Sequence, residues 1–114
     1  PPPRGLMDIL CNYAGYRKCV PILVFDAYRV KGAGREQETW HNLHVIYTRE
    51  AETADMFIER ATHELAKNHR VRVVSSDGAE QIIILGNGAL RVSARAFERE
   101  VRAVEAEIRE FLDQ

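Results

Sequence analysis

The sequence has no apolar run approaching the roughly 20 residues that a membrane-spanning helix requires. It also does not open with the basic and then apolar segments of a secretory signal, because its first ten residues are PPPRGLMDIL. The two cysteines, Cys11 and Cys19, lack metal or redox spacing, which favours reduced thiols. These absences predict a cytoplasmic protein with no membrane partner.

Several common catalytic and cofactor motifs are also absent. No Gly-x-Gly-x-x-Gly or Walker pattern occurs, and neither His41 with His44 nor His63 with His69 has the spacing of a metal pair on one face. The segment after Asp26 reads Ala-Tyr, so it lacks the second aspartate of a haloacid dehalogenase-type phosphatase. Nucleotide binding by these motifs and that phosphatase chemistry are therefore disfavoured.

The chain as a whole has almost no net charge, but its two parts carry charge of opposite sign. The net charge is −1, which argues against a protein that coats nucleic acid by charge alone. Residues 1–35 nevertheless carry six basic and two acidic residues, whereas residues 36–114 carry ten basic and fifteen acidic ones. This uneven split permits a basic rim beside an acidic pocket.

What is present suits one domain of 114 residues, with 46% apolar and 29% charged residues. Continuous apolar runs of strand length alternate with stretches of helical periodicity. We predict helices over 6–14 (stopped by Gly15), 52–69, 77–86 (short, stopped by Gly86) and 94–111 (capped by Ser93), strands over 19–26, 43–48, 71–76 and 89–93, and a long loop over 27–42.

This alternation predicts an α/β fold with a mainly parallel sheet that helices cover on both faces. In such sheets, ligands bind outside the carboxyl ends of the strands. Asp26 ends one predicted strand and Asp77 ends another, so both carboxylates are expected at this edge. Glu52 and Asp55 lie three residues apart, on one face at the start of a predicted helix.

Each acid also has a purely structural interpretation. Glu52 and Asp55 suit the first turn of a helix, where the helix dipole favours negative charge. Asp77 precedes Gly78, and this pair is typical of a turn or cap. Asp26 is followed by a long loop, so no unpaired helix N–H obviously needs its carboxylate. The convergence of separate acids is what favours a site, because clustered carboxylates are tolerated around a hard cation such as Mg²⁺ or Mn²⁺.

Three long blocks carry a family resemblance: NYAGYRKCVPILVFDAYRVKG, YTREAETADMFIERATHELAK and VRVVSSDGAEQIIILGNGALRVSA. They resemble the YacP-like NYN-domain family, a branch of the PIN-like ribonucleases, from about residue 6 to residue 101. The resemblance implies a three-layer PIN-like domain and a cytoplasmic, Mg²⁺- or Mn²⁺-dependent endoribonuclease that cleaves messenger RNA at the ribosome. By position, the metal-binding acids would be Asp26, Asp55 and Asp77, with Glu52 close by to orient water or act as a base.

The chain departs from this family at its start. The family opens with a central strand carrying the sequence VDGYN, whose aspartate is a principal metal ligand, and this strand is missing here. Its absence would leave two strand edges without partners. We therefore expect either homo-oligomerisation through those edges or a rearranged sheet.

A basic loop follows Asp26, and it mixes an aromatic side chain with cations as RNA contacts require. Surface cations are also commonly just solvated, so a plain surface loop is the alternative. A non-catalytic RNA- or ribosome-binding module on the same fold would keep this loop without needing the acids. The predicted RNA-binding residues are Tyr28, Arg29, Lys31 and Arg35, joined by Arg17 and Lys18 if the first helix packs as in the family.

Overall fold

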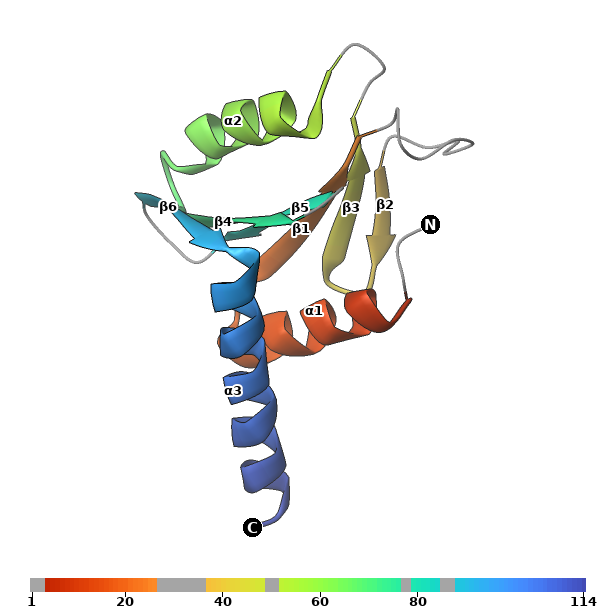
Figure 1. The fold of residues 1–114 in the computed structure, drawn as a ribbon, viewed down its shortest axis with the longest axis vertical. Coiled ribbons are helices and arrows are strands. Elements are labelled where there is room, and N and C mark those ends of the chain that lie inside the picture. Colours follow the sequence, from red (N-terminus) through yellow and green to blue (C-terminus); the bar gives the residue numbers. More distant parts are fainter. Residues whose placement is uncertain (1–3, 27–36, 49–51, 77–78, 85–87) are drawn as a thin grey trace.

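The fold is built on one six-stranded sheet (Figure 1). The structure is a computed structural model, and it describes residues 4–26, 37–48, 52–76, 79–84 and 88–114. Within these ranges the chain forms three helices and six strands. In chain order they are α1 (Arg4–Arg17), β1 (Val20–Phe25), β2 (Gln37–Trp40), β3 (Leu43–Tyr47), α2 (Ala54–Leu65), β4 (Arg70–Ser76), β5 (Ala79–Ile84), β6 (Gly88–Ser93) and α3 (Ala94–Leu112).

The sheet is mixed, with the strand order β2-β3-β1-β5-β4-β6. β1 pairs with β3, and β4 with β6, in parallel, whereas the other three strand pairs are antiparallel. The predicted mainly parallel sheet is therefore wrong, although the α/β class is confirmed. Because β5 runs against both β1 and β4, the strands β1, β3, β4 and β6 still share one direction.

Strand β5 also corrects the prediction of a short helix over 77–86. Its sequence contains three consecutive isoleucines, and such β-branched side chains favour strands over helices. Ser76 and Ala79 are register partners, so only Asp77 and Gly78 separate β4 from β5 in the sequence. An Asp-Gly pair between two apolar runs is a strong hairpin signal, and it outweighs the helical interpretation.

A second strand was missed in the predicted loop over 27–42. Residues 37–40 form β2, which pairs antiparallel with β3 through a two-residue connection, His41 and Asn42. His41 has a φ of 54°, in the left-handed region that tight hairpin turns use. The polar sequence of β2 hid it because it is an edge strand with mostly exposed side chains.

The two predicted unpaired edges are not found, because β5 pairs with both β1 and β4. The outer strands of the described sheet are instead β2 and β6. Homo-oligomerisation through exposed edges stays a prediction.

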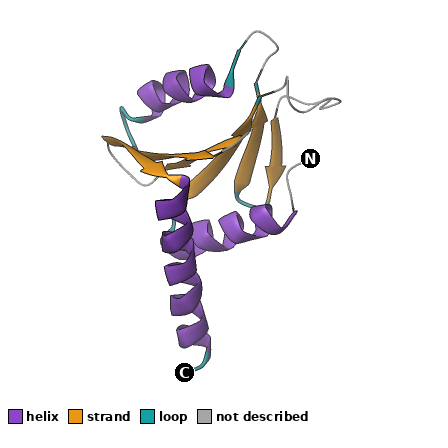
Figure 2. Cartoon of the chain, in the orientation of Figure 1, coloured by secondary structure: helices purple, strands orange, loops and turns teal. Residues whose placement is uncertain are grey.

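Helices lie on both faces of the sheet (Figure 2). Along β4, Val71 and Val73 pack with α2, while Val74 packs on the other side with α1 and α3, as strand alternation requires. The predicted apolar face of α2 is confirmed, because all of its members join this packing: Ala54, Phe57, Ile58, Ala61, Leu65 and Ala66.

The ends of the helices are only partly as predicted. Ser93 caps α3, since its side chain accepts a hydrogen bond from Ala96 N–H, and this cap was predicted. Helix α1 continues through Gly15 and ends near Lys18, whose φ is 57°. The N–H of Cys19 reaches back to the carbonyl of Ala14, which is the bond of a Schellman motif.

A partly buried polar cluster fastens α1 and α3 to the sheet. Arg72 of β4 donates from both terminal nitrogens to the carboxylate of Glu100 in α3, each over 2.7 Å. The hydroxyl of Tyr13 in α1 donates to the same carboxylate over 2.5 Å. Each group thereby compensates the cost of burying the others, so the cluster fixes how α3 leaves the sheet.

This cluster predicts that the protein loses stability at alkaline pH. Burial, together with the Glu100 carboxylate, raises the pKa of Tyr13 from 10.0 to about 12, so the folded state favours the neutral phenol. That contribution is complete below pH 10 and is lost as the pH rises towards 12.

We predict that Tyr13→Phe lowers the free energy of unfolding at neutral pH. The difference in this free energy between the variant and the wild type should shrink as the pH rises from 10 towards 12, as measured by urea unfolding. Tyr16→Phe, which alters a more exposed phenol on the same helix, should show a much smaller change; an equal change would contradict the assignment.

Candidate active site at the strand exits

The carboxyl ends of β1, β3, β4 and β6 meet at one edge of the sheet, called the exit edge below. Register brings Phe25, the last residue of β1, and Ser76, the last residue of β4, to opposite sides of Ala79. Two strand spacings separate them, which is about 10 Å. The prediction that Asp26 follows a strand into this edge is therefore met in the fold. Asp77 follows Ser76 in the sequence and lies outside the described residues.

Asp26 has a defined partner at the exit edge. It is half-buried, and its Oδ1 accepts a hydrogen bond from the backbone N–H of Ala54, the first residue of α2. This contact corrects the expectation that no helix N–H needs the Asp26 carboxylate, because the helix that supplies it lies 28 residues further along the chain. The positive end of the α2 dipole stabilises this carboxylate.

The start of α2 brings further oxygen atoms to the exit edge. Thr53 caps the helix by accepting a hydrogen bond from Met56 N–H. Asp55 lies exposed in the first turn. Because Asp26 accepts from the residue between Thr53 and Asp55, the two predicted site acids Asp26 and Asp55 both lie at the start of α2.

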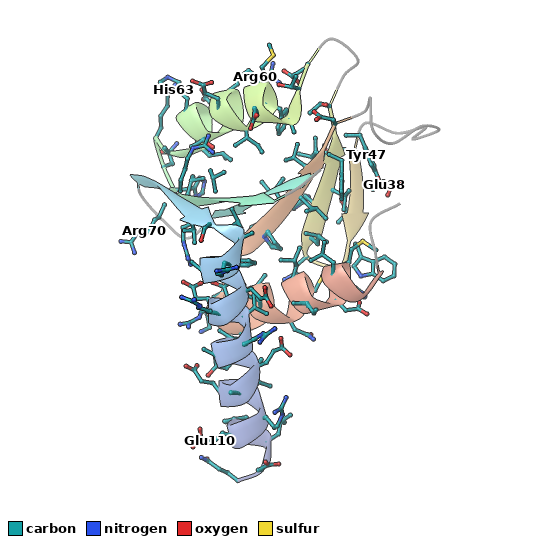
Figure 3. The ribbon with its side chains drawn as sticks, viewed as in Figure 1. Glu38, Tyr47, Arg60, His63, Arg70 and Glu110 are labelled. Carbon is teal, nitrogen blue, oxygen red and sulfur yellow. The ribbon has the colours of Figure 1, made fainter. Side chains whose placement is uncertain are left out.

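Glu52 is committed to an ion pair. Its carboxylate lies 2.9 Å from Arg60, and its side chain is 18% exposed while that of Arg60 is 68% exposed. Arg60 extends from α2 (labelled in Figure 3). Its guanidinium carbon lies 5.5 Å from the centroid of the Phe57 ring. Arg60 was not among the predicted site residues; it lies eight residues beyond Glu52, which is about two helical turns.

The described residues do not bring the predicted RNA-binding residues together at one site. Tyr28, Arg29, Lys31 and Arg35 lie outside the described residues. Arg17 and Lys18 are exposed at the end of α1, before β1 begins. They are thus at the amino end of a six-residue strand whose other end is the exit edge, about 20 Å away. The conditional expectation that they join the exit edge is therefore not met in this fold, and a role of these two residues in RNA binding stays a prediction.

The chemistry of the donors suits a hard divalent cation, since Asp26 and Asp55 supply carboxylate oxygens. Across the residues that the structure describes, however, no group of three His, Cys, Asp or Glu side chains is arranged to hold a metal. The predicted set includes Asp77, so the three-carboxylate site stays a prediction.

Comparison with known proteins identifies the fold's relatives. A family model, the YacP-like NYN domain, matches residues 4–114. The chain belongs to the YacP-like NYN domain family. The predicted resemblance is thereby confirmed, and it covers every element of this NYN domain.

A curated protein and a crystal structure, both named YacP and both from Bacillus subtilis, agree with this assignment. The NYN domain is 42% identical over 104 residues to a protein of strain 168 named "Uncharacterized protein YacP", and this match covers 90% of the chain and 61% of the relative. The crystal structure of Rae1 (YacP) matches with a TM-score of 0.71 and 32% identity, over 96% of this chain and 63% of that one. The chain therefore spans about three fifths of the length of these relatives. Within the described residues, no helix is long and apolar enough to cross a membrane.

The bond between Asp26 and Ala54 predicts a structural cost for removing the carboxylate. We expect Asp26→Ala to lower the free energy of unfolding by about 1–2 kcal/mol, as the loss of a helix-capping acceptor does. Asp26→Asn keeps an oxygen acceptor and should cost less. Urea unfolding measures both, with the exposed Asp55→Ala as the matched control. If Asp26→Ala unfolds no more easily than Asp55→Ala, the link between β1 and α2 carries no stability.

Proposed function

We propose that this NYN domain is the catalytic part of a divalent-metal-dependent endoribonuclease, which hydrolyses phosphodiester bonds of RNA. Family membership supports a nuclease-like, RNA-related function. The observation that carries the proposal is the meeting of Asp26 with the start of α2, because it brings the acids of two separate elements to the exit edge.

In this proposal Asp26, Asp55 and Asp77 hold Mg²⁺ or Mn²⁺. The cation would neutralise charge that develops on the phosphate and would activate the attacking water. Asp26 is already fixed by Ala54 N–H, so its carboxylate needs little reordering to act as a ligand. The ion pair between Glu52 and Arg60 favours a role for Glu52 in orienting water over a role as the base.

The proposed substrate is RNA, and the ribosome is the expected partner from the family resemblance. Tyr28, Arg29, Lys31 and Arg35 would contact RNA from the loop that follows Asp26. A cation among the acids offsets the repulsion that a carboxylate cluster would otherwise exert on a polyanion.

Metal binding tests this proposal without requiring turnover. We predict saturable Mn²⁺ binding by calorimetry, weakened in Asp77→Asn by at least roughly 10–100-fold, because that range is the cost of losing a group that only supports a metal ligand. Asp77 is preferred to Asp26 for this test because Asp26 also holds α2. Asp8→Asn, which changes an exposed aspartate of α1, is the matched control and should leave binding unchanged.

Two outcomes would contradict the proposal. The wild-type chain could fail to bind Mn²⁺, or Asp77→Asn and Asp8→Asn could bind it equally well. Either result would favour the alternative, an RNA- or ribosome-binding module that has no need of the acids.

A further inference from the structure

Helix α3 has a row of arginines on the side that faces away from the protein. Phe97, Val101 and Val104 form its buried side. Arg95, Arg99 and Arg102 are exposed, and their spacing of four and then three residues places them together on the opposite side. We call these three residues the arginine face. Figure 1 shows α1 beside the first half of α3, while the second half of α3 extends away from the sheet.

Two of the three arginines of this face form no ion pair among the described residues. Arg102 pairs with Glu98 over 2.6 Å, and both side chains are exposed. Arg95 and Arg99 have no ion-pair partner among the residues that the structure describes. By contrast, Arg72 is fully engaged in the cluster that holds α3 to the sheet.

The charge in the first turn of α3 also has the sign that a helix disfavours there. A helix dipole stabilises acidic residues in the first turn and basic residues in the last. Arg95 lies in the first turn of α3, which contains no acid. The second half is mainly acidic and carries Glu105, Glu107 and Glu110, with one arginine, Arg109, and Asp113 follows as the C-cap. Helix stability therefore does not account for arginines near the start.

The arginine face begins at the exit edge. Helix α3 follows directly from β6, whose last residue, Ser93, is the register partner of Ser75. Ser75 is the next-to-last residue of β4, which Asp77 follows. Counted across β5 and β4, the end of β6 is three strand spacings from the end of β1, or about 14 Å. A strand of RNA bound at the acids could therefore reach Arg95 and Arg99.

We propose that the arginine face binds the phosphate backbone of single-stranded RNA beside the candidate active site. This inference rests on the proposed function and adds a binding surface outside the loop that follows Asp26. Arginine suits this role because its planar guanidinium can donate two parallel hydrogen bonds to a phosphate. An anionic membrane is a poorer fit, because the acidic second half of the same helix, which includes Glu110, would be repelled by it (Figure 3).

The test measures binding of a fluorescent single-stranded RNA by anisotropy at several salt concentrations, with EDTA present so that no metal contributes. Arg95→Gln with Arg99→Gln should weaken binding by roughly tenfold or more at low salt. Loss of two phosphate contacts should reduce the slope of log affinity against log salt by about 1.4. Arg95→Lys with Arg99→Lys should retain most of the slope. Arg109→Gln, an exposed arginine further along the same helix, is the matched control and should bind as the wild type does.

Thermal unfolding distinguishes an effect on RNA from an effect on folding. The double glutamine variant should not melt below the wild type, because it removes a cation from the unfavourable end of the helix. Equal RNA affinity for the double variant and Arg109→Gln would overturn the proposal, as would a wild-type chain that binds anionic vesicles but not RNA. Because metal is excluded, a failure of the metal site in the preceding section would leave this result unchanged.

Discussion

The pairing of β5 with both β1 and β4 is the constraint on which the rest of the structure depends. Since β5 runs against each of them, β1 and β4 must run in the same direction, and their carboxyl ends must reach the same edge. Parallel pairing then adds β3 on one side and β6 on the other. An antiparallel strand in the middle of the sheet thereby produces the arrangement of strand ends that an all-parallel sheet would give. The exit edge, the start of α2 and the start of α3 all follow from it.

At the exit edge, the start of α2 and a bound cation would both attract the carboxylate of Asp26. The start of α2 presents unpaired N–H groups and the positive end of a helix dipole, both of which attract a carboxylate. Asp26 meets this demand through Ala54 N–H, so its position is explained by folding alone. The same position is also suitable for a metal ligand, because a carboxylate that is already held loses less freedom when it binds a cation. Structural and catalytic roles for Asp26 are therefore compatible.

Much of the fold could be predicted from the sequence because its core elements have strong periodicity. The apolar face of α2, the Ser93 cap and the strands that contain Leu23, Val45 and Val73 all follow from local patterns. The edge strand β2 could not be found in this way, since its exposed side chains give no apolar alternation. Strand β5 was misassigned because a short apolar run fits either a helix or a strand, and the Asp-Gly pair before it was interpreted as a turn or cap leading into a helix.

The candidate site was predicted less completely for a physical reason. Strand ends can be located from sequence, which is why Asp26 and the start of α2 were identified. Contacts between distant segments depend on register and packing, so the bond from Asp26 to Ala54 and the cluster around Arg72 were not foreseen. Arg17 and Lys18 precede β1 and therefore lie at its amino end, far from the exit edge at its carboxyl end.

Paramagnetic broadening by Mn²⁺ in amide NMR spectra tests the central claim most directly, because it locates a bound cation in the folded chain. The account predicts that substoichiometric Mn²⁺ broadens the amide signals of Phe25 and Ala54 at the exit edge, while Lys18, at the far end of β1, stays sharp and Mg²⁺ competes with the effect. Broadening centred on Lys18 or on the distal half of α3, or none at all, would contradict it.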